Sequence, residues 1–591
     1  MSAHTFHIPV MGIGFTVDTP LKVAKYGISS VISLVDDILL EQMREYHCRR
    51  EGIPFEPIPE TDPDPRARRI TAYLNLIDHL VARDVRALQS SPFAPGSEIT
   101  RYFALIPDSP PKALYRRMLN CGDPVRQRQM QDELRNLAVP GRIDINIMVA
   151  LDCAVYRDGE KLPVEQNDAM SAMRGFAQSS LESAVVLSAG VNPHLYGYIS
   201  HFSDFLPDAR GRLRKQVILK VSDFRSAEVQ GKLLAKRGVW VSEFRIESGL
   251  NCGGHSFPTK GQLTGPVLAE FREKRAALRD ALNGIYQQAL AAHGHTVPPA
   301  AFDFRVTVQG GIGTAAEDLL LRTHYGADAT GWATPFLLVP EVVNVDDELL
   351  RLLSKATPAE VFLSDSSPVG VPYWNLRTSP SEKARERRIR EGNPGSPCRK
   401  HFLAFSDELT PIPICTASRQ YQRLKLDHLV KEGLSGESLA EARRKVLLKS
   451  CICHDLGGCA TLKLGIDPSA TPAVCCGPNM AYFSQIATLD QMVDHIYGRK
   501  SLPIGAGRPN IFIQELALYV EYAQRQFAGH GVPAGSRQAK YFSDYLANLL
   551  AGIAHYRQSS AVVALGEEER FLRELDRYEA EIRALAVGVS V

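Results

Sequence analysis

The feature that most constrains the fold is a succession of eight short apolar segments in the first 345 residues. They run over 8–15, 28–37, 143–152, 183–191, 216–222, 241–249, 304–311 and 327–336, with helical or loop stretches between them. Apolar runs without polar alternation are typical of strands buried on both faces of a parallel sheet. Such alternation of strands and helices predicts a doubly wound sheet or a (β/α)8 TIM barrel, and the count of eight favours the barrel.

The rest of the chain has a different texture. Residues from about 40 to 140 are rich in Arg, Pro and helical patterns, which predicts a mostly helical insertion. We expect three parts: a barrel over 1–345, an extended arm with a Cys-rich segment over 346–480, and amphipathic helices over 481–591. The α/β barrel would thus carry a largely helical C-terminal extension. The arginine run in the arm is interpreted as a solvated helix face, although an anionic partner is an alternative.

Composition narrows the classes of partner. The formal net charge is +2, so nothing drives the whole chain toward nucleic acid or an anionic membrane. No apolar run is long enough to span a bilayer. The opening MSAHTFHIPVMGIGF lacks the basic segment and long apolar core of a signal peptide. We therefore expect a cytoplasmic protein, and association into a homo-oligomer stays open.

Glycine-rich turns follow each of the last two predicted strands. In VTVQGGIGTAAEDLLLRTHYGADATGWATPF, residues 306–336, Gly310, Gly311 and Gly313 let bare N–H groups approach an anion. The helix expected over 315–326 would add the positive end of its dipole. Turns after the seventh and eighth strands form phosphate sites in many barrels. We therefore predict a phosphate here, the alternative being that these glycines only make tight barrel corners.

Three segments carry a family resemblance. They are IPVMGIGFTVDTPLKVAKYGISSVISL at 8–34, FRIESGLNCGGHSFP at 244–258, and QGGIGTAAED with YGADATGWATPF at 309–336. In this order they resemble FMN-dependent TIM-barrel oxidoreductases of the nitronate monooxygenase (2-nitropropane dioxygenase) group, with enoyl reductases and the synthase domain of glutamate synthase further off. The resemblance covers about residues 8–345 without the insertion. The stretch SGLNC after Glu247 is longer than the family's version.

The resemblance implies an FMN cofactor and assigns roles to particular residues. In the resembled group the histidine that matches His255 lies at the active site, where it would transfer a proton near neutral pH. Lys220 is a candidate by its position and not by the resemblance: it ends the apolar run QVILK, where a barrel side chain faces the site, and its ammonium would stabilise negative charge on the reduced flavin. A loop histidine and a lysine reaching solvent at the barrel rim are the alternatives. The residues expected to bind the cofactor are Met11, Gly12, Lys220, Gln309, Gly310, Gly311, Gly313, Thr314, Gly331, Trp332, Ala333 and Thr334. Asn192 is a candidate for orienting substrate, or else an Asn-Pro turn residue.

Cysteines concentrate in the last third of the chain. Thiolates there could bind an iron–sulfur cluster or zinc, and the candidates are Cys415, Cys451, Cys453, Cys475 and Cys476. The spacing is neither that of a zinc ribbon nor that of a ferredoxin. A set of buried cysteines in a helical cap that binds no metal is the alternative.

These observations lead to one functional hypothesis and two alternatives. The first is an FMN-dependent oxidoreductase acting on a small organic substrate with an acidic C–H or a reducible double bond. The second is an iron–sulfur flavoprotein reductase or lyase that receives electrons from a ferredoxin-like donor protein. The third is a non-redox barrel enzyme that binds a phosphorylated metabolite, with Lys220 forming a Schiff base.

Overall fold

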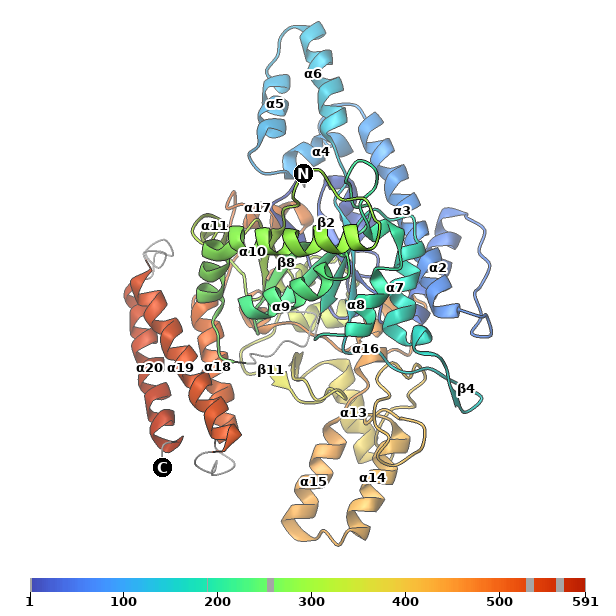
Figure 1. Ribbon diagram of the computed structural model, residues 1–591, viewed down its shortest axis with the longest axis vertical. Helices are drawn as coiled ribbons and strands as arrows, with labels where there is room; N and C mark the ends of the chain where they lie inside the picture. Colours follow the sequence, from blue (N-terminus) through green and yellow to red (C-terminus); the bar gives the residue numbers. More distant parts are fainter. Residues whose placement is uncertain (1–2, 189, 252–259, 528–535, 560–567, 590–591) are drawn as a thin grey trace.

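The computed structural model describes residues 3–188, 190–251, 260–527, 536–559 and 568–589, and it confirms the TIM barrel. Eight parallel strands close in the order β1-β10-β9-β8-β7-β6-β3-β2 (Figure 1). Barrel strands that follow one another along the chain are therefore neighbours in space. The strands are β1 Phe6–Ile8, β2 Ser29–Ser33, β3 Ile143–Met148, β6 Ala184–Ser188, β7 Gln216–Val221, β8 Val241–Glu247, β9 Arg305–Gln309 and β10 Ala329–Gly331.

Side-chain caps fix where several barrel helices begin. Asp36, Asn192, Asp223 and Thr314 each follow a strand and accept a hydrogen bond from the backbone N–H three residues later. Such caps satisfy donors that the first helical turn leaves free. Asn192 is thus a turn and cap residue, as in the alternative interpretation, and a role in orienting substrate stays a prediction. These caps determine where the loops at the carboxyl face of the barrel end and the following helices begin.

The helices around the barrel and in the insertion agree with the predicted fold class. Five helices lie between β2 and β3, and α5 and α6 project from the barrel at one end of the molecule (Figure 1). The elements are α1 Thr19–Val23, α2 Asp37–Glu51, α3 Pro65–Ser90, α4 Glu98–Leu105, α5 Pro110–Leu119, α6 Pro124–Leu137, α7 Asp168–Gln178, α8 Pro193–Ile199, α9 Phe224–Ala235, α10 Thr264–Ala292 and α11 Ala315–Thr323, with the short hairpin β4 Tyr156–Arg157 and β5 Glu160–Lys161.

The region after the barrel is largely helical, as expected. It contains α12 Asp347–Leu353, β11 Val361–Ser364, β12 Tyr373–Leu376, α13 Pro380–Arg390, α14 Arg419–Lys431, α15 Gly436–Leu448, α16 Ile452–Lys463, α17 Leu489–Ile496, α18 Ile511–Phe527, α19 Arg537–Gln558 and α20 Glu568–Val589. The hairpin of α14 and α15 projects at the end opposite α5 and α6, while α18, α19 and α20 lie together at one side (Figure 1).

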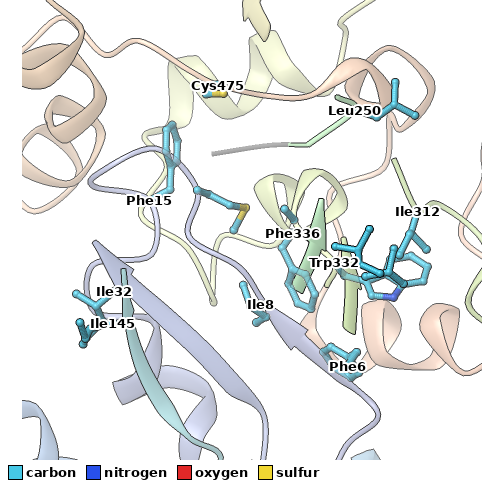
Figure 2. Close-up of a cluster of buried hydrophobic side chains, with 14 of the residues drawn as sticks. Phe6, Ile8, Phe15, Ile32, Ile145, Leu250, Ile312, Trp332, Phe336 and Cys475 are labelled. Carbon is cyan, nitrogen blue, oxygen red and sulfur yellow. The ribbon is translucent and has the colours of Figure 1, made fainter. Parts of the chain in front are cut away.

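This region packs onto the barrel and does not hang free of it. Gly14, in the turn after β1, donates its backbone N–H to the carbonyl of Leu456 on α16 at 2.9 Å. Figure 2 shows Phe6 and Ile8 of β1, Trp332 and Phe336 after β10, and Cys475 of the C-terminal region in one buried cluster. The hydrophobic core is thus continuous from the barrel into the extension. No helix in the described part of the chain has the length and apolar character to cross a membrane.

Candidate active site

The two predicted glycine turns meet at one small cavity at the carboxyl face of the barrel. The cavity is lined by Gln309, Gly310, Gly311 and Ile312 after β9, by Gly331, Ala333 and Thr334 after β10, and by Pro9 and Asn251. Six of these nine residues are among those that the sequence assigned to cofactor binding. They come together because parallel strands of a barrel all end on the same face.

Glycine is required at two of these positions. Gly311 has a φ of +78°, a left-handed conformation that side chains disfavour, and a Cβ there would meet Leu250 Cδ1 at 2.6 Å. A Cβ on Gly331 would lie 2.7 Å from Gln309 Cβ and 3.0 Å from Pro9 Cγ. The turns therefore bring bare backbone close to the cavity.

The cavity holds hydrogen-bond donors without acceptors. The Nδ2 of Asn251 is buried and has no partner among the described residues. The backbone N–H groups of Gly311, Ile312 and Ala333 likewise donate to no acceptor in the described ranges. Buried donors are normally paired, so a set of unpaired ones indicates a missing acceptor. These donors are the kind that an anion such as the phosphate of FMN would need. The cavity itself encloses about 10 Å³, room for about one water, so the surrounding turns would have to move apart to admit a phosphate.

A helix cap uses the backbone donors of Gly313 and Thr314, and their role in cofactor binding stays a prediction. Their backbone N–H groups donate to Glu317 Oε2 at 2.8 and 3.1 Å, and the Thr314 hydroxyl accepts from the Glu317 N–H in return. This is the reciprocal capping box of α11. Neither residue lines the cavity. The cavity is consequently lined by residues before Gly313 and not by the first turn of α11.

Two residues of the C-terminal region support the glycine turn, and no sequence pattern indicated them. Arg508 donates to both carboxylate oxygens of Glu317 at 2.9 Å and to the Gly311 carbonyl at 2.8 Å. Asn479 Nδ2 donates to the same carbonyl at 2.6 Å and its Oδ1 accepts from Arg508. All of these side chains are buried. Residues far along the chain therefore hold the turn in place.

Polar side chains at four strand ends form a chain of hydrogen bonds across the barrel. Lys220 of β7 pairs with Glu247 of β8 at 2.6 Å, and Gln309 of β9 donates to the same carboxylate at 2.6 Å. The Nε2 of His7 on β1 lies 3.4 Å from Oε1, the side-chain amide oxygen, of Gln309. Burial, together with the charge of Arg245, holds the pKa of His7 well below its usual range, so the ring is neutral and donates to Gln309. Lys220 is thus a fixed cation inside the barrel mouth and not a solvated rim lysine.

An apolar cavity lies on the other side of the end of β1. Its lining residues are Val10, Gly12, Ile13, Ser33, Val35, Asn146, Met148, Leu151, Val369, Leu403, Ile452, Cys453, Leu456 and Cys475. Asn146 is 3% exposed, and its Oδ1 has no partner among the described residues. The cavity encloses about 40 Å³, which is room for a few waters only. The ring system of a flavin would therefore enter only if side chains from α16 and its neighbours moved.

The remaining predicted residues have varied positions. Gly12 lines the apolar cavity, and Met11 is fully buried beside it. The indole N–H of Trp332 donates to Thr330 and its ring packs edge-on against His495, so this side chain serves the core. His255 lies outside the described residues, and its catalytic role stays a prediction.

The cysteines predicted to bind metal do not form a site for a single ion. Among the described residues, no three side chains of His, Cys, Asp or Glu are grouped so that they could hold a metal ion. Cys451 and Cys453 have their sulfurs 3.9 Å apart, whereas Cys475 lines the apolar cavity and Cys476 donates its backbone N–H to Trp374. All five are buried and none is in a disulfide.

Known proteins resemble this chain only distantly. No family model matches it, and neither does any curated protein. The enoyl reductase domain of MlnA from the macrolactin biosynthesis cluster of Bacillus amyloliquefaciens is 15% identical with a TM-score of 0.33, over 64% of this chain and 85% of that one. A nitroalkane oxidase from Streptomyces ansochromogenes is 10% identical with a TM-score of 0.33, over 84% and 95%. Likeness at this level carries no functional argument, so function is inferred from the geometry alone.

Proposed function

We propose that this protein is an FMN-dependent oxidoreductase. The observation that carries the proposal is the cavity where both glycine turns, the end of β1 and Asn251 converge with unpaired donors. Backbone N–H groups and an amide side chain in a buried cradle are the groups that bind phosphate. An anion there would remove the cost of leaving buried donors unpaired.

The residues of this chain suggest how the cofactor would be held. The amides of Gly311, Ile312 and Ala333, with Asn251, would bind the phosphate. Pro9 lines the phosphate cavity and Val10 lines the apolar one, so the two cavities adjoin at the segment that follows β1. When bound, FMN would supply hydride and electron transfer. The unpaired Oδ1 of Asn146 would accept a hydrogen bond from a donor on the ring or on the substrate.

Lys220 would stabilise negative charge that develops during the reaction. Glu247 and Gln309 fix its position, so little reorganisation is needed when charge appears at the barrel mouth. The apolar lining would keep water away from the reacting groups and favour an uncharged, apolar substrate. We propose a small organic molecule with an acidic C–H or a reducible double bond.

The Lys220 contact separates this proposal from the non-redox alternative. A lysine forms a Schiff base only as the neutral amine, which is why such lysines lie in apolar pockets or beside other cations. Lys220 instead lies 2.6 Å from the Glu247 carboxylate in a buried ion pair, so its Nζ is held by that contact and not left unpaired in an apolar pocket. The ion pair therefore favours a role in charge stabilisation.

The proposal is tested by placing a negative charge in the phosphate cavity. Asn251→Asp is isosteric, but its carboxylate would repel the phosphate, so the variant should lose nearly all bound FMN while keeping its secondary structure. Asn120→Asp, the same change at an exposed helix end, should retain it. Flavin is measured by visible absorption and by mass spectrometry of the released cofactor. Full FMN content in Asn251→Asp, or parent protein that takes up no FMN when supplied with it, would overturn the proposal.

A further inference from the structure

A chamber of about 460 Å³ lies beside the apolar cavity. Its walls come from the starts of α2 and α3, from the segment between β3 and α7 that carries the hairpin of β4 and β5, and from residues 400–413. Exposed residues such as Glu60, Arg157 and His401 belong to its lining, so the chamber opens to solvent. Its volume falls within the range of about 300–1,000 Å³ that is usual for pockets that bind small organic molecules.

Only a thin wall separates the chamber from the apolar cavity. Leu151 lines the apolar cavity, and Cys153, two residues later, lines the chamber. Leu403 likewise lines the apolar cavity, whereas its neighbours Phe402 and Ala404 line the chamber. Every residue that lines the apolar cavity is buried or half-buried. The chamber is therefore placed to lead from solvent to the apolar cavity.

The mostly buried cations of the chamber wall have carboxylate partners. Arg66 and Arg69 both donate to Asp37, at 2.7 and 3.0 Å. Lys400 pairs with Asp36, the residue that caps α2. These contacts neutralise the three cations, so none of them is left to hold an anion in the chamber.

Asp168 is the exception among the buried charges of the chamber wall. It is 9% exposed, and no described residue donates a hydrogen bond to its carboxylate. Arg66 Nε lies 3.8 Å from its Oδ1, too far for a hydrogen bond, because the N–H groups of Arg66 donate to Asp37 and to the carbonyls of Leu34, Val35 and Asp168 itself. Burial raises the pKa of Asp168 from 3.8 to about 6, although Arg66 opposes the shift. The carboxylate thus lacks the compensation that a buried charge normally has.

The place of Asp168 at the start of α7 offers a structural role instead. An acid in the first turn of a helix interacts favourably with the helix dipole. However, the Ala169 N–H donates to Asp152 at 3.0 Å, so Asp168 does not satisfy this free donor of the first turn. The dipole accounts for an acid at this position, but it does not require one that is buried in the wall of a chamber.

We propose that the chamber binds the substrate through a protonated amino group that pairs with Asp168. The identification of this ligand as the substrate rests on the proposed function. The substrate would be a small organic amine whose uncharged, apolar end reaches the apolar cavity, while its ammonium group stays in the chamber. An ammonium supplies both the hydrogen bond and the opposite charge that the carboxylate lacks, whereas a neutral donor supplies only the first.

The test uses hexylamine as the probe, with hexanol and hexanoate as its neutral and anionic counterparts. Binding to the full-length protein supplied with FMN is measured by isothermal titration calorimetry at about pH 7.5, where the amine is protonated and the carboxylate of Asp168 is ionised. Hexylamine should bind at least about tenfold more tightly than either counterpart. Hexanol or hexanoate that binds as tightly as hexylamine would overturn the proposal, and so would hexylamine that shows no saturable binding.

Asp168→Asn removes the charge and keeps the shape of the side chain. This variant should bind hexylamine at least about tenfold more weakly than the parent, with no change for hexanol. Asp347→Asn is the matched control, since its carboxylate lies in the first turn of α12, is 92% exposed and pairs with Lys463 at 2.9 Å. A purely structural role for Asp168 would lower the melting temperature and leave the preference for hexylamine intact, which would refute the proposal.

A second variant places the amine in the chamber and not elsewhere on the surface. Ala154 lines the chamber and is half-buried. Ala154→Leu adds three carbons to this wall, so hexylamine should bind more weakly while FMN content stays that of the parent. Unchanged affinity for hexylamine in this variant would mean that the amine binds outside the chamber.

The chamber and the FMN site can be tested independently. Asn251→Asp should lose FMN and bind hexylamine like the parent, whereas Asp168→Asn should keep FMN. Selective binding of hexylamine by a protein that takes up no FMN would remove the proposed oxidoreductase and leave an amine-binding site. An FMN-loaded protein that does not prefer hexylamine would remove only the amine site.

Discussion

The Nζ of Lys220 lies 2.6 Å from Oε1 of Glu247, and this oxygen also accepts a hydrogen bond from Gln309 at 2.6 Å. The Lys220 side chain is 7% exposed and that of Glu247 is 10% exposed. The pair is therefore mostly removed from water, and each partner compensates the charge of the other.

Removing the carboxylate charge should both destabilise the barrel and impair the reaction. Glu247→Gln leaves the Lys220 cation buried without a counter-ion, which we expect to cost about 3 kcal/mol. The double variant Lys220→Met with Glu247→Gln should recover most of the stability but no activity. Thermal melting and turnover of the parent, both single variants and the double variant measure the coupling. A Glu247→Gln variant that melts like the parent would show that the pair contributes nothing.

Arg508 should affect FMN binding without touching the phosphate cavity. Arg508→Met removes the donors that hold Glu317 and the Gly311 carbonyl, so the glycine turn loses its support and FMN should dissociate more readily. Losing one partner of such a buried pair costs about 3 kcal/mol. Arg525→Met, at an exposed ion pair on α18, is the control. Equilibrium dialysis against FMN gives the comparison, and equal affinities in the two variants would contradict the supporting role.

A methyl group at Gly331 should disturb the cavity and the strand together. In Gly331→Ala the new carbon would lie 2.7 Å from Gln309 Cβ and 3.0 Å from Pro9 Cγ. We expect a loss of about 1–3 kcal/mol and weaker retention of FMN. Gly284→Ala places a methyl in open space on helix α10 and should be neutral or stabilising. Melting curves of both variants test this expectation. A Gly331→Ala variant that melts like the parent would mean that the turn has room for a methyl group beside Gln309 and Pro9.

Glu515 should make stability depend on pH. It accepts from the Thr264 N–H and hydroxyl at 2.8 and 2.6 Å, has no cation within salt-bridge distance among the described residues, and burial raises its pKa from 4.5 to about 7. Between these values the folded protein keeps a proton that the unfolded chain releases, so stability falls as pH rises through this window. The loss is at most about 3 kcal/mol, and it is complete above pH 7.

Glu515→Gln should abolish that dependence. The variant should melt higher than the parent at about pH 8 and like the parent near pH 4, because the parent carboxyl is protonated in both states at low pH. Glu521→Gln, at an exposed position on the same helix, should follow the parent at every pH. Identical pH profiles for Glu515→Gln and the parent would show that the carboxyl is solvated.

His255→Ala tests the catalytic role implied by the family resemblance. If the imidazole transfers a proton, turnover should fall by about 10² or more with no change in FMN content. His293→Ala, at the exposed end of α10, is the matched control. Full turnover in His255→Ala would assign this histidine a structural role.

The sequence by itself determined the barrel and pointed to six of the nine residues that line the cavity at its carboxyl face. Apolar segments of strand length alternate with helical ones, and glycines stand at the ends of the seventh and eighth. These are local patterns, and parallel closure then places all such strand ends on one face. Gln309, Gly311 and Gly331 could therefore be assigned to one site before any contact was known. The same local pattern could not indicate that Thr314 caps α11, because a capping threonine and a phosphate-binding threonine occupy the same position before a helix.

Only the tertiary structure decided which distant side chains complete the site. Arg508 and Asn479 contact Gly311 across 197 and 168 residues of chain, and Gly14 after β1 donates to the Leu456 carbonyl on α16. No periodicity or spacing in the sequence indicates such contacts. Local residue patterns set backbone conformation, whereas contacts between distant segments depend on how whole elements pack, and that free energy is shared among many side chains.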